Sequence, residues 1–388
     1  MDFRLTAEQV MFRDQVARWA RDRLAEGALA RAHEPGFPFD VARSAAEAGL
    51  TGIAMAEADG GQGGALMDAI LAIEAVAAVC PRSADVIQAT NFGPIRTLAE
   101  YATPEQKARF LAPLLRGETA IGLGMSEPGA GSAVTELATT ATEDGDGWRL
   151  NGAKVFTSNS PEASVFLIYC RFGPGTGNIG SVLLERGQEG FSLGKPARYM
   201  NGEEWCPLFF DNVRIPPENL LLGPGGFKRQ IAGFNAERIG NAARALALGR
   251  HAFEIARQHA QDRHQFGRPL CEFQGIQWSF AEMHARLEAA QLLLYRAAVE
   301  ADDGLPDAQA TAVAKLMCNR AGFEVADAAM QVLGGLGYGT DSLVEYIFRK
   351  TRGWMIAGGS TEMMKNRIAE GVFGRRFSQR PPRTEAAQ

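Results

Sequence analysis

The order of sequence patterns along the chain constrains its fold most. From Thr6 to about Leu115, apolar residues recur at the spacing of amphipathic helices, and Thr103-Pro104 is typical of an N-cap followed by proline at the first helical position. Between about Gly117 and Leu222, short β-rich runs alternate with turn signals such as Asn151-Gly152. These runs are Trp148 to Ser158, Val165 to Arg171, Ser181 to Leu184 and Leu208 to Ile215. Such strands predict a small antiparallel barrel or sandwich.

Long Ala- and Leu-rich segments return after Gly226 and predict a bundle of largely antiparallel helices. They run from about Phe234 to Arg263, Phe273 to Asp303 and Asp307 to Leu333, with a shorter pair after Ser342. We therefore expect an α+β multi-domain protein. Its parts are an N-terminal helical domain (1–116), a middle antiparallel β-barrel (117–226), a C-terminal four-helix bundle (227–380) and a disordered tail (381–388).

Composition excludes several classes of function. The chain has 388 residues, 46% of them hydrophobic, which is enough for an ample core without cross-links. Its five scattered cysteines argue against a disulfide framework or a metal site and favour a reducing compartment. The net charge of -5 includes no basic block, so we expect no nucleic-acid partner. Early charges argue against a signal peptide, and no apolar run approaches the roughly 20 residues that span a bilayer. These features predict a soluble, cytoplasmic protein.

The glycine-rich segment 334–339 has two interpretations. It is not a Rossmann dinucleotide motif, because it ends a long helix rather than following a strand. It could be an ordinary helix C-cap and loop. Alternatively, its glycines could let the backbone approach an anion such as a pyrophosphate.

Three separated signatures carry a resemblance when they are taken together. They are MSEPGAGS at 125–132, DRHQFG at 262–267 and QVLGGLGYG at 331–339, followed by GGSTEMMKNR at 358–367. In this order they resemble the FAD-dependent acyl-CoA dehydrogenase family over nearly the whole chain. The resemblance implies FAD held between the β domain and the helical bundle, an acyl-CoA substrate, and a homotetramer built as a dimer of dimers. It also implies an electron-transfer flavoprotein or another electron acceptor as partner.

The same resemblance implies which residues hold the cofactor. Met125 and Ser126 correspond to residues at the flavin pyrimidine edge, and Phe156 and Ser158 to an aromatic and a hydroxyl beside the flavin ring. Arg263 and Phe266 correspond to residues that hold the ADP half of FAD. Gln331, Gly334 and Gly335 correspond to residues that contact this half from a neighbouring subunit. The segment with Ser360 and Glu362 corresponds to a further contact with the ADP portion. Each residue taken singly also fits an ordinary turn, strand or helix end.

The catalytic assignment depends on a missing carboxylate. Dehydrogenation of an acyl thioester needs a base for the α-proton and an acceptor for the β-hydride, which flavin N5 supplies. Most of the family places the basic Glu where this chain has Gly358. A subset resembling isovaleryl-CoA and long-chain acyl-CoA dehydrogenases places it on an earlier helix before an arginine, which here is Glu237-Arg238. We predict that Glu237 is the base and that the Gly358 N–H binds the thioester carbonyl. Glu237 could instead be a first-turn glutamate favouring the helix dipole, and Glu362 is a rival carboxylate.

Substrate contacts follow the resemblance less closely. Ser132 corresponds to a serine near the CoA phosphates, and Asn235 and Arg238 to residues near the CoA moiety. Ala133 replaces a usual Asp, and the segment 201–205 replaces a usual Arg-x-Ser-Asp/Glu-Thr. The alternatives are an acyl-CoA oxidase, an acyl-carrier-protein-linked dehydrogenase, an enoyl thioester reductase or a flavin monooxygenase relative. A catalytically dead helical scaffold is the non-enzymatic alternative.

Overall fold

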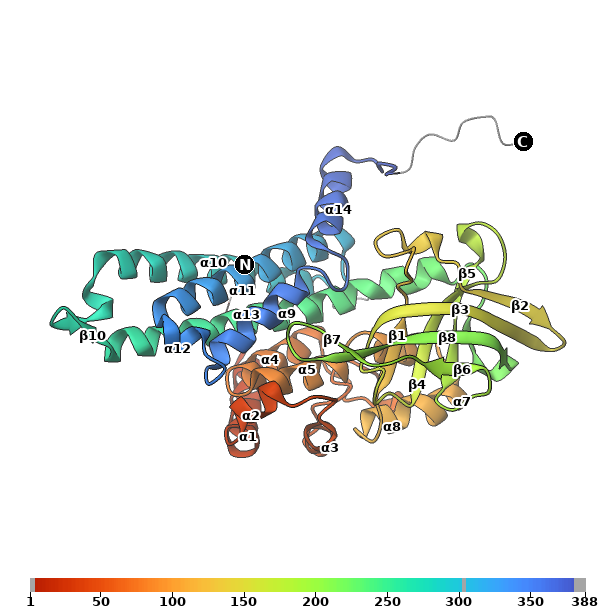
Figure 1. Ribbon diagram of the computed structural model, residues 1–388, viewed down its shortest axis with the longest axis horizontal. Helices are drawn as coiled ribbons and strands as arrows, with labels where there is room; N and C mark the ends of the chain where they lie inside the picture. Colours follow the sequence, from red (N-terminus) through yellow and green to blue (C-terminus); the bar gives the residue numbers. More distant parts are fainter. Residues whose placement is uncertain (1–3, 302–304, 380–388) are drawn as a thin grey trace.

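The computed structural model describes residues 4–301 and 305–379, so the tail predicted to be disordered at 381–388 lies outside the described residues. A β domain lies at one end of the molecule, and helices from both ends of the chain pack together at the other (Figure 1). The long helix α9 runs from the β domain into the helical part (Figure 1). The predicted helical N- and C-terminal regions and middle β region are confirmed.

The helical N-terminal region begins after Thr6, and the N-cap predicted at Thr103 is confirmed. Thr6 caps α1 in a reciprocal capping box with Gln9, and Thr103 does the same with Gln106 before a proline at N1. The central helix α4 is apolar on nearly all sides and is therefore buried. The helices of this region are α1 (Ala7–Leu24), α2 (Ala28–His33), α3 (Phe39–Glu47), α4 (Leu66–Ala77), α5 (Pro81–Ala89), α6 (Pro94–Tyr101), α7 (Pro104–Gln106) and α8 (Ala112–Leu115).

The middle region is an open nine-stranded sheet, so the predicted closed barrel is wrong. Its order is β6-β8-β3-β2-β4-β5-β9, with β1 added beside β4 and β7 beside β8. The pairings of β1 and β2 with β4 are parallel, and no described strand joins the two ends. The local sequence pattern predicted four of these strands but not the non-local pairings between them. The strands are β1 (Ile121–Gly124), β2 (Thr140–Asp144), β3 (Gly147–Ser158), β4 (Val165–Arg171), β5 (Ile179–Glu185), β6 (Phe191–Leu193), β7 (Ala197–Arg198), β8 (Glu204–Ile215) and β9 (Leu220–Leu222).

The C-terminal helices include one important change of boundary. Helix α9 begins at Phe227, well before the expected start, so Glu237 lies about three turns inside it. The first-turn dipole interpretation of Glu237 is therefore wrong, because the macrodipole acts within the terminal turn. The other elements are β10 (His264–Gln265), β11 (Arg268–Pro269), α10 (Gln274–Val299), α11 (Ala308–Leu333), α12 (Gly335–Tyr338), α13 (Leu343–Trp354) and α14 (Thr361–Phe373).

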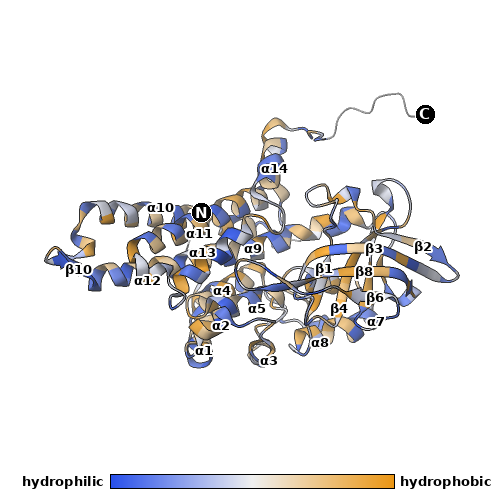
Figure 2. Ribbon diagram, in the orientation of Figure 1, coloured by the Kyte–Doolittle hydropathy of each residue, from blue (hydrophilic) through white to orange (hydrophobic). Residues whose placement is uncertain are grey.

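Helices α9 and α11 pack very closely, and this contact positions the site. A Cβ placed on Gly249 of α9 would lie 2.7 Å from the Gly322 Cα of α11, so both positions require glycine. One hydrophobic cluster extends from α4 and α5 into α9, α10 and α11, joining the N- and C-terminal helices. Apolar residues are also concentrated on β1 and β4, whereas the β10 hairpin is polar (Figure 2). No described helix is long and apolar enough to cross a bilayer.

Candidate active site

Glu237 belongs to α9, is partly buried and faces α5. Its carboxylate accepts hydrogen bonds from one side chain of that helix. Gln88 Nε2 donates to both carboxylate oxygens, at 3.1 Å to Oε1 and 2.9 Å to Oε2. A Cβ placed on Gly93, at the start of α6, would lie 3.1 Å from Glu237 Oε2. Gly93 also has φ +75°, so glycine there satisfies the backbone and leaves room for the carboxylate.

The surroundings of Glu237 make it a better base than an exposed carboxylate. Burial raises the pKa of Glu237 to about 7, against the opposing effects of Arg244, the Gln88 hydrogen bond, Lys315 and Arg238. Desolvation disfavours the charged form, and a pKa near neutrality suits proton abstraction from carbon. By contrast, Glu362 is exposed, accepts a hydrogen bond from Thr361 at 2.9 Å and has a lowered pKa.

Gly358 lies in the connection between α13 and α14, near the polar side chains of Asn241 and Lys315. Gly358 and Gly359 have φ +67° and +93°, which favour glycine. A Cβ at Gly358 would lie 3.5 Å from Asn241 Nδ2 and 3.6 Å from Lys315 Cε. Ser360 caps α14, accepting from the Met363 N–H at 3.4 Å.

The structure adds a polar cluster that sequence reasoning missed. Lys315 Nζ donates to the carbonyl oxygens of Trp354, Ala357 and Gly359. Asn319, one turn later on α11, donates to the Trp354 carbonyl at 2.6 Å and to Asn241 Oδ1 at 3.1 Å. Burial lowers the pKa of Lys315. The three carbonyl acceptors nevertheless match the three N–H donors of its charged ammonium form. The sequence feature that could have revealed this cluster is the pair of polar residues, Lys315 and Asn319, one helical turn apart in the Ala-rich α11.

The two residues predicted near CoA contact one another. Arg238 Nη1 donates to Asn235 Oδ1 at 2.9 Å, and Asn235 Nδ2 donates to the Pro306 carbonyl at 3.2 Å. Arg238 Nε is buried and has no partner among the described residues. Arg238 also lies beside the glycine loop, since a Cβ at Gly359 would be 3.9 Å from its Nη2.

The segment 201–205, which departs from the family pattern, anchors a buried charge cluster. Glu203 bonds Arg82 of α5 at 2.9 Å and also pairs with Lys350 of α13. Asp85 pairs with Lys350 at 2.6 Å and with Arg244 of α9 at 2.7 Å. Although burial acts to raise it, Lys350 and Arg82 hold the pKa of Glu203 well below its usual value. The cluster therefore ties all three regions together beside the base.

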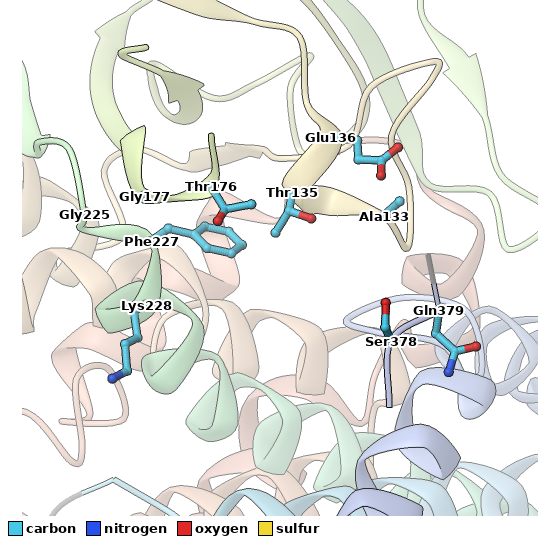
Figure 3. A pocket seen from close by; sticks show the side chains of 10 residues that line it. All are labelled: Ala133, Thr135, Glu136, Thr176, Gly177, Gly225, Phe227, Lys228, Ser378 and Gln379. Atoms are coloured by element: carbon cyan, nitrogen blue, oxygen red, sulfur yellow. The ribbon is translucent and has the colours of Figure 1, made fainter. Parts of the chain in front are cut away.

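A separate hollow of about 960 Å³ opens where loops of the β domain meet the start of α9. Figure 3 shows Ala133 and Glu136 on one side, and Phe227 and Lys228 at the beginning of α9 on another. The exposed Ser132 is the neighbour of Ala133 in sequence. The predicted CoA-phosphate residue thus lies at the edge of an open, mixed-charge hollow.

Comparison with known proteins assigns the family. Three models match consecutive parts of the chain: "Acyl-CoA dehydrogenase, N-terminal domain" at 6–118, "middle domain" at 122–213 and "C-terminal domain" at 224–373. The chain belongs to the acyl-CoA dehydrogenase family.

Two relatives and one solved structure illustrate the range of similarity within the family. A short-chain-specific acyl-CoA dehydrogenase of Clostridium acetobutylicum is 33% identical over 96% of this chain and 100% of its own. A 3-sulfinopropanoyl-CoA desulfinase of Paraburkholderia xenovorans is 30% identical over 97% of this chain and 99% of its own. The structure described as the FAD complex of PigA has a TM-score of 0.90 at 25% identity, covering 96% of this chain and 99% of the other.

Acyl-CoA dehydrogenases use FAD, and the β domain of this member offers a face that fits a flavin. The exposed Phe156 has φ +59° and contacts Trp205, with ring centroids 4.7 Å apart. The Met125–Ser126 backbone lies against β3, since Met125 O accepts from Lys154 at 3.2 Å and Ser126 O from the Val155 N–H at 2.9 Å. Ser158 is exposed at the end of the same strand. Met125, Ser126, Phe156 and Ser158 are therefore brought together.

The residues predicted for the ADP half lie apart from that face. Arg263 ends α9, and Phe266 in the β10–β11 turn is 94% exposed. Gln331, Gly334 and Gly335 are exposed near α12, and a Cβ on either glycine would meet no atom within 4 Å. The β10 hairpin and the β domain lie at opposite ends of the molecule (Figure 1). One chain therefore leaves these ADP candidates open rather than assembling them around Phe156.

Proposed function

We propose that this protein oxidises an acyl-CoA thioester to the trans-2-enoyl-CoA, with Glu237 abstracting the α-proton. The observation that carries the proposal is a partly buried Glu237, with a pKa raised to about 7, beside a loop that has Gly358 at the family's usual glutamate position. Bound FAD supplies the acceptor for the β-hydride. Glu237 thus belongs to the arrangement resembling isovaleryl-CoA and long-chain acyl-CoA dehydrogenases.

Three neighbours prepare Glu237 for this role. Gln88 holds both carboxylate oxygens and fixes the side-chain direction, while the cations of Arg244 and Lys315 favour the ionised form needed to accept a proton. The Gly358 N–H donates to the thioester carbonyl and stabilises the charge that develops there as the α-proton leaves. The base and the polarising donor come from different parts of the chain and act on neighbouring groups of the substrate, the base on the α-carbon and the donor on the thioester carbonyl.

CoA is held by Ser132, Asn235 and Arg238 in this proposal. The buried Arg238 Nε without a partner among the described residues supports it, because such a donor is costly unless a ligand or water satisfies it. The hollow at Ala133 and Lys228 lies where the CoA phosphates would enter from solvent. The reduced flavin is then reoxidised by an electron-transfer flavoprotein or another electron acceptor.

The FAD site is completed by oligomerisation. Met125, Ser126, Phe156, Ser158, Ser360 and Glu362 of one subunit face the flavin or its ADP portion, with Arg263 and Phe266 holding the ADP half. Gln331, Gly334 and Gly335 contact that half from a second subunit. Their exposure supports this division of the site, and we propose a homotetramer built from two dimers.

The decisive experiment replaces the base while preserving its shape. Glu237→Gln should retain FAD, yet anaerobic mixing with the best substrate from a panel of acyl-CoAs should reduce the flavin about 10²–10⁴-fold more slowly. Glu118→Gln, at an exposed glutamate that pairs with Arg116, is the matched control and should keep the parent's rate of flavin reduction. If Glu237→Gln reduces the flavin as fast as the parent, Glu237 is not the base.

A further inference from the structure

Lys315 is buried in α11, and within the described residues its ammonium group donates hydrogen bonds only to backbone carbonyls at the end of α13 and in the loop that follows. Its side chain is 1% exposed, and Nζ lies 2.9 Å from Ala357 O, 2.8 Å from Gly359 O and 3.4 Å from Trp354 O. Trp354 is the last residue of α13, and Ala357 and Gly359 lie in the connection between α13 and α14. A buried cation is costly, so the three carbonyl contacts are what stabilises it there.

These contacts fix the direction of a neighbouring donor. The 357–358 peptide is trans, and in a trans peptide the C=O and the N–H point in opposite directions. Because Ala357 O points to Lys315, the Gly358 N–H of the same peptide points away from Lys315. Within the described residues this N–H donates to no acceptor. It is therefore an oriented donor that remains available to a ligand.

Other contacts hold the two ends of the same loop. Asn319 shares the Trp354 carbonyl with Lys315, donating at 2.6 Å. At the far end, the Thr361 N–H donates to the Met355 carbonyl at 3.0 Å. Between these points Gly358 and Gly359 both have positive φ, so the loop has little intrinsic preference for one peptide orientation. Lys315 supplies that preference.

We propose that Lys315 is a positioning residue that orients the 357–358 peptide so that the Gly358 N–H polarises the thioester carbonyl of the substrate. The inference rests on the proposed function, because it assigns the origin of the acidified α-proton that Glu237 removes. Lys315 itself touches neither substrate nor cofactor in this proposal. The chemistry it serves is recognition of a thioester oxygen that gains negative charge.

The test uses [1-¹³C]acetyl-CoA, which binds as a thioester but has no β-carbon to oxidise. Two quantities are measured on the FAD-loaded protein: the infrared stretching frequency of the bound ¹³C=O group, and exchange of the α-protons with D₂O by mass spectrometry. The frequency reports polarisation alone, whereas exchange requires both polarisation and the base. Lys315→Met removes the ammonium group from a side chain of similar length.

In the parent we expect a carbonyl frequency below that of free acetyl-CoA, together with α-proton exchange. Lys315→Met should return the frequency toward the free value and slow exchange about 10²-fold, the usual cost of a misplaced transition-state donor. Glu237→Gln should abolish exchange while leaving the frequency unchanged. Lys107→Met, which breaks a half-buried pair with Asp59 far from the loop, is the control and should change neither quantity.

Parent-like frequency and exchange in Lys315→Met would overturn the role of Lys315 and leave Glu237 untouched. Parent-like exchange in Glu237→Gln would instead overturn the proposed function. If Lys315→Met does not fold, Lys315→Gln serves in its place, because its amide keeps up to two donors on a shorter chain. That variant should give an intermediate frequency, and an unchanged frequency would count against the proposal.

Discussion

The surroundings of Glu237 and the candidate ADP site differ in how completely one chain builds them. Around Glu237, side chains from α5, α9, α11 and α13 form hydrogen bonds and buried ion pairs before any ligand arrives. At the ADP side, Phe266 is 94% exposed and Gln331, Gly334 and Gly335 face open space. In the proposed function, the base is therefore preorganised within the subunit, whereas cofactor retention would depend on what covers an exposed surface.

The largest expected effect comes from breaking the buried charges on the base side. Asp85→Asn removes a charge that contacts Arg82, Arg244 and Lys350 together, leaving buried cations short of a partner. We expect a loss of about 3–5 kcal/mol in the free energy of unfolding, measured by urea denaturation. The control Asp14→Asn breaks the exposed pair with Arg13 and should cost less than about 1 kcal/mol. Equal losses in the two variants would show that the buried cluster is not what shapes this region.

A smaller effect is expected at the exposed candidate ADP site, where the quantity that changes is the affinity for FAD. Arg263→Ala should weaken FAD binding by about 1.5–3 kcal/mol, or roughly tenfold to hundredfold, because a charge-assisted phosphate contact is lost. FAD retention during dialysis and titration of the apoprotein measure this change, while sedimentation follows the oligomer. Arg257→Ala is the control, since Arg257 is also exposed, lies on α9 and pairs with Glu254. Unchanged affinity in Arg263→Ala would remove this arginine from the cofactor site.

The pH dependence should sharpen the assignment of the base. Glu237 must be ionised to accept a proton, so the rate of anaerobic flavin reduction at low substrate should rise with pH and level off above the pKa of about 7. Below that pKa the rate should fall about tenfold for each pH unit. A profile that stays flat from pH 5.5 to 8.5 would contradict Glu237 as the titrating group.

The smallest effect should come from the hydrogen-bond partner of the base. In the parent, the hydrogen bonds from Gln88 to both carboxylate oxygens lower the pKa of Glu237. Gln88→Leu removes these hydrogen bonds. The midpoint of the pH profile should therefore move to higher pH, with about a tenfold lower rate at pH 7, since hydrogen bonds to charged groups contribute about 1.5–3 kcal/mol. The plateau at high pH should change little, and a midpoint that moves to lower pH would reverse the assigned role of Gln88.

Motifs predicted the family and the candidate base, but not the residues that prepare that base. Glu237 could be found because it precedes Arg238 and because Gly358 lacks a side chain. Gln88 is 149 positions from Glu237, and Lys315 is 42 positions from Ala357. No local pattern encodes such pairings, because they arise only when α5 and α11 pack against α9. The closed barrel was wrong for the same reason: strand pairing is non-local.

By itself, the sequence determined the helical N- and C-terminal regions, four strands of the middle region, the capped helix start at Thr103, and the family. Periodicity, caps and turns are local properties, so they can be identified from the residues in order. Only the tertiary structure decided that the sheet is open, that α9 begins early enough to place Glu237 away from the helix end, and that Lys315 binds the Gly358 loop. These outcomes depend on burial and on contacts between distant segments, which give a carboxylate its pKa and a peptide its direction.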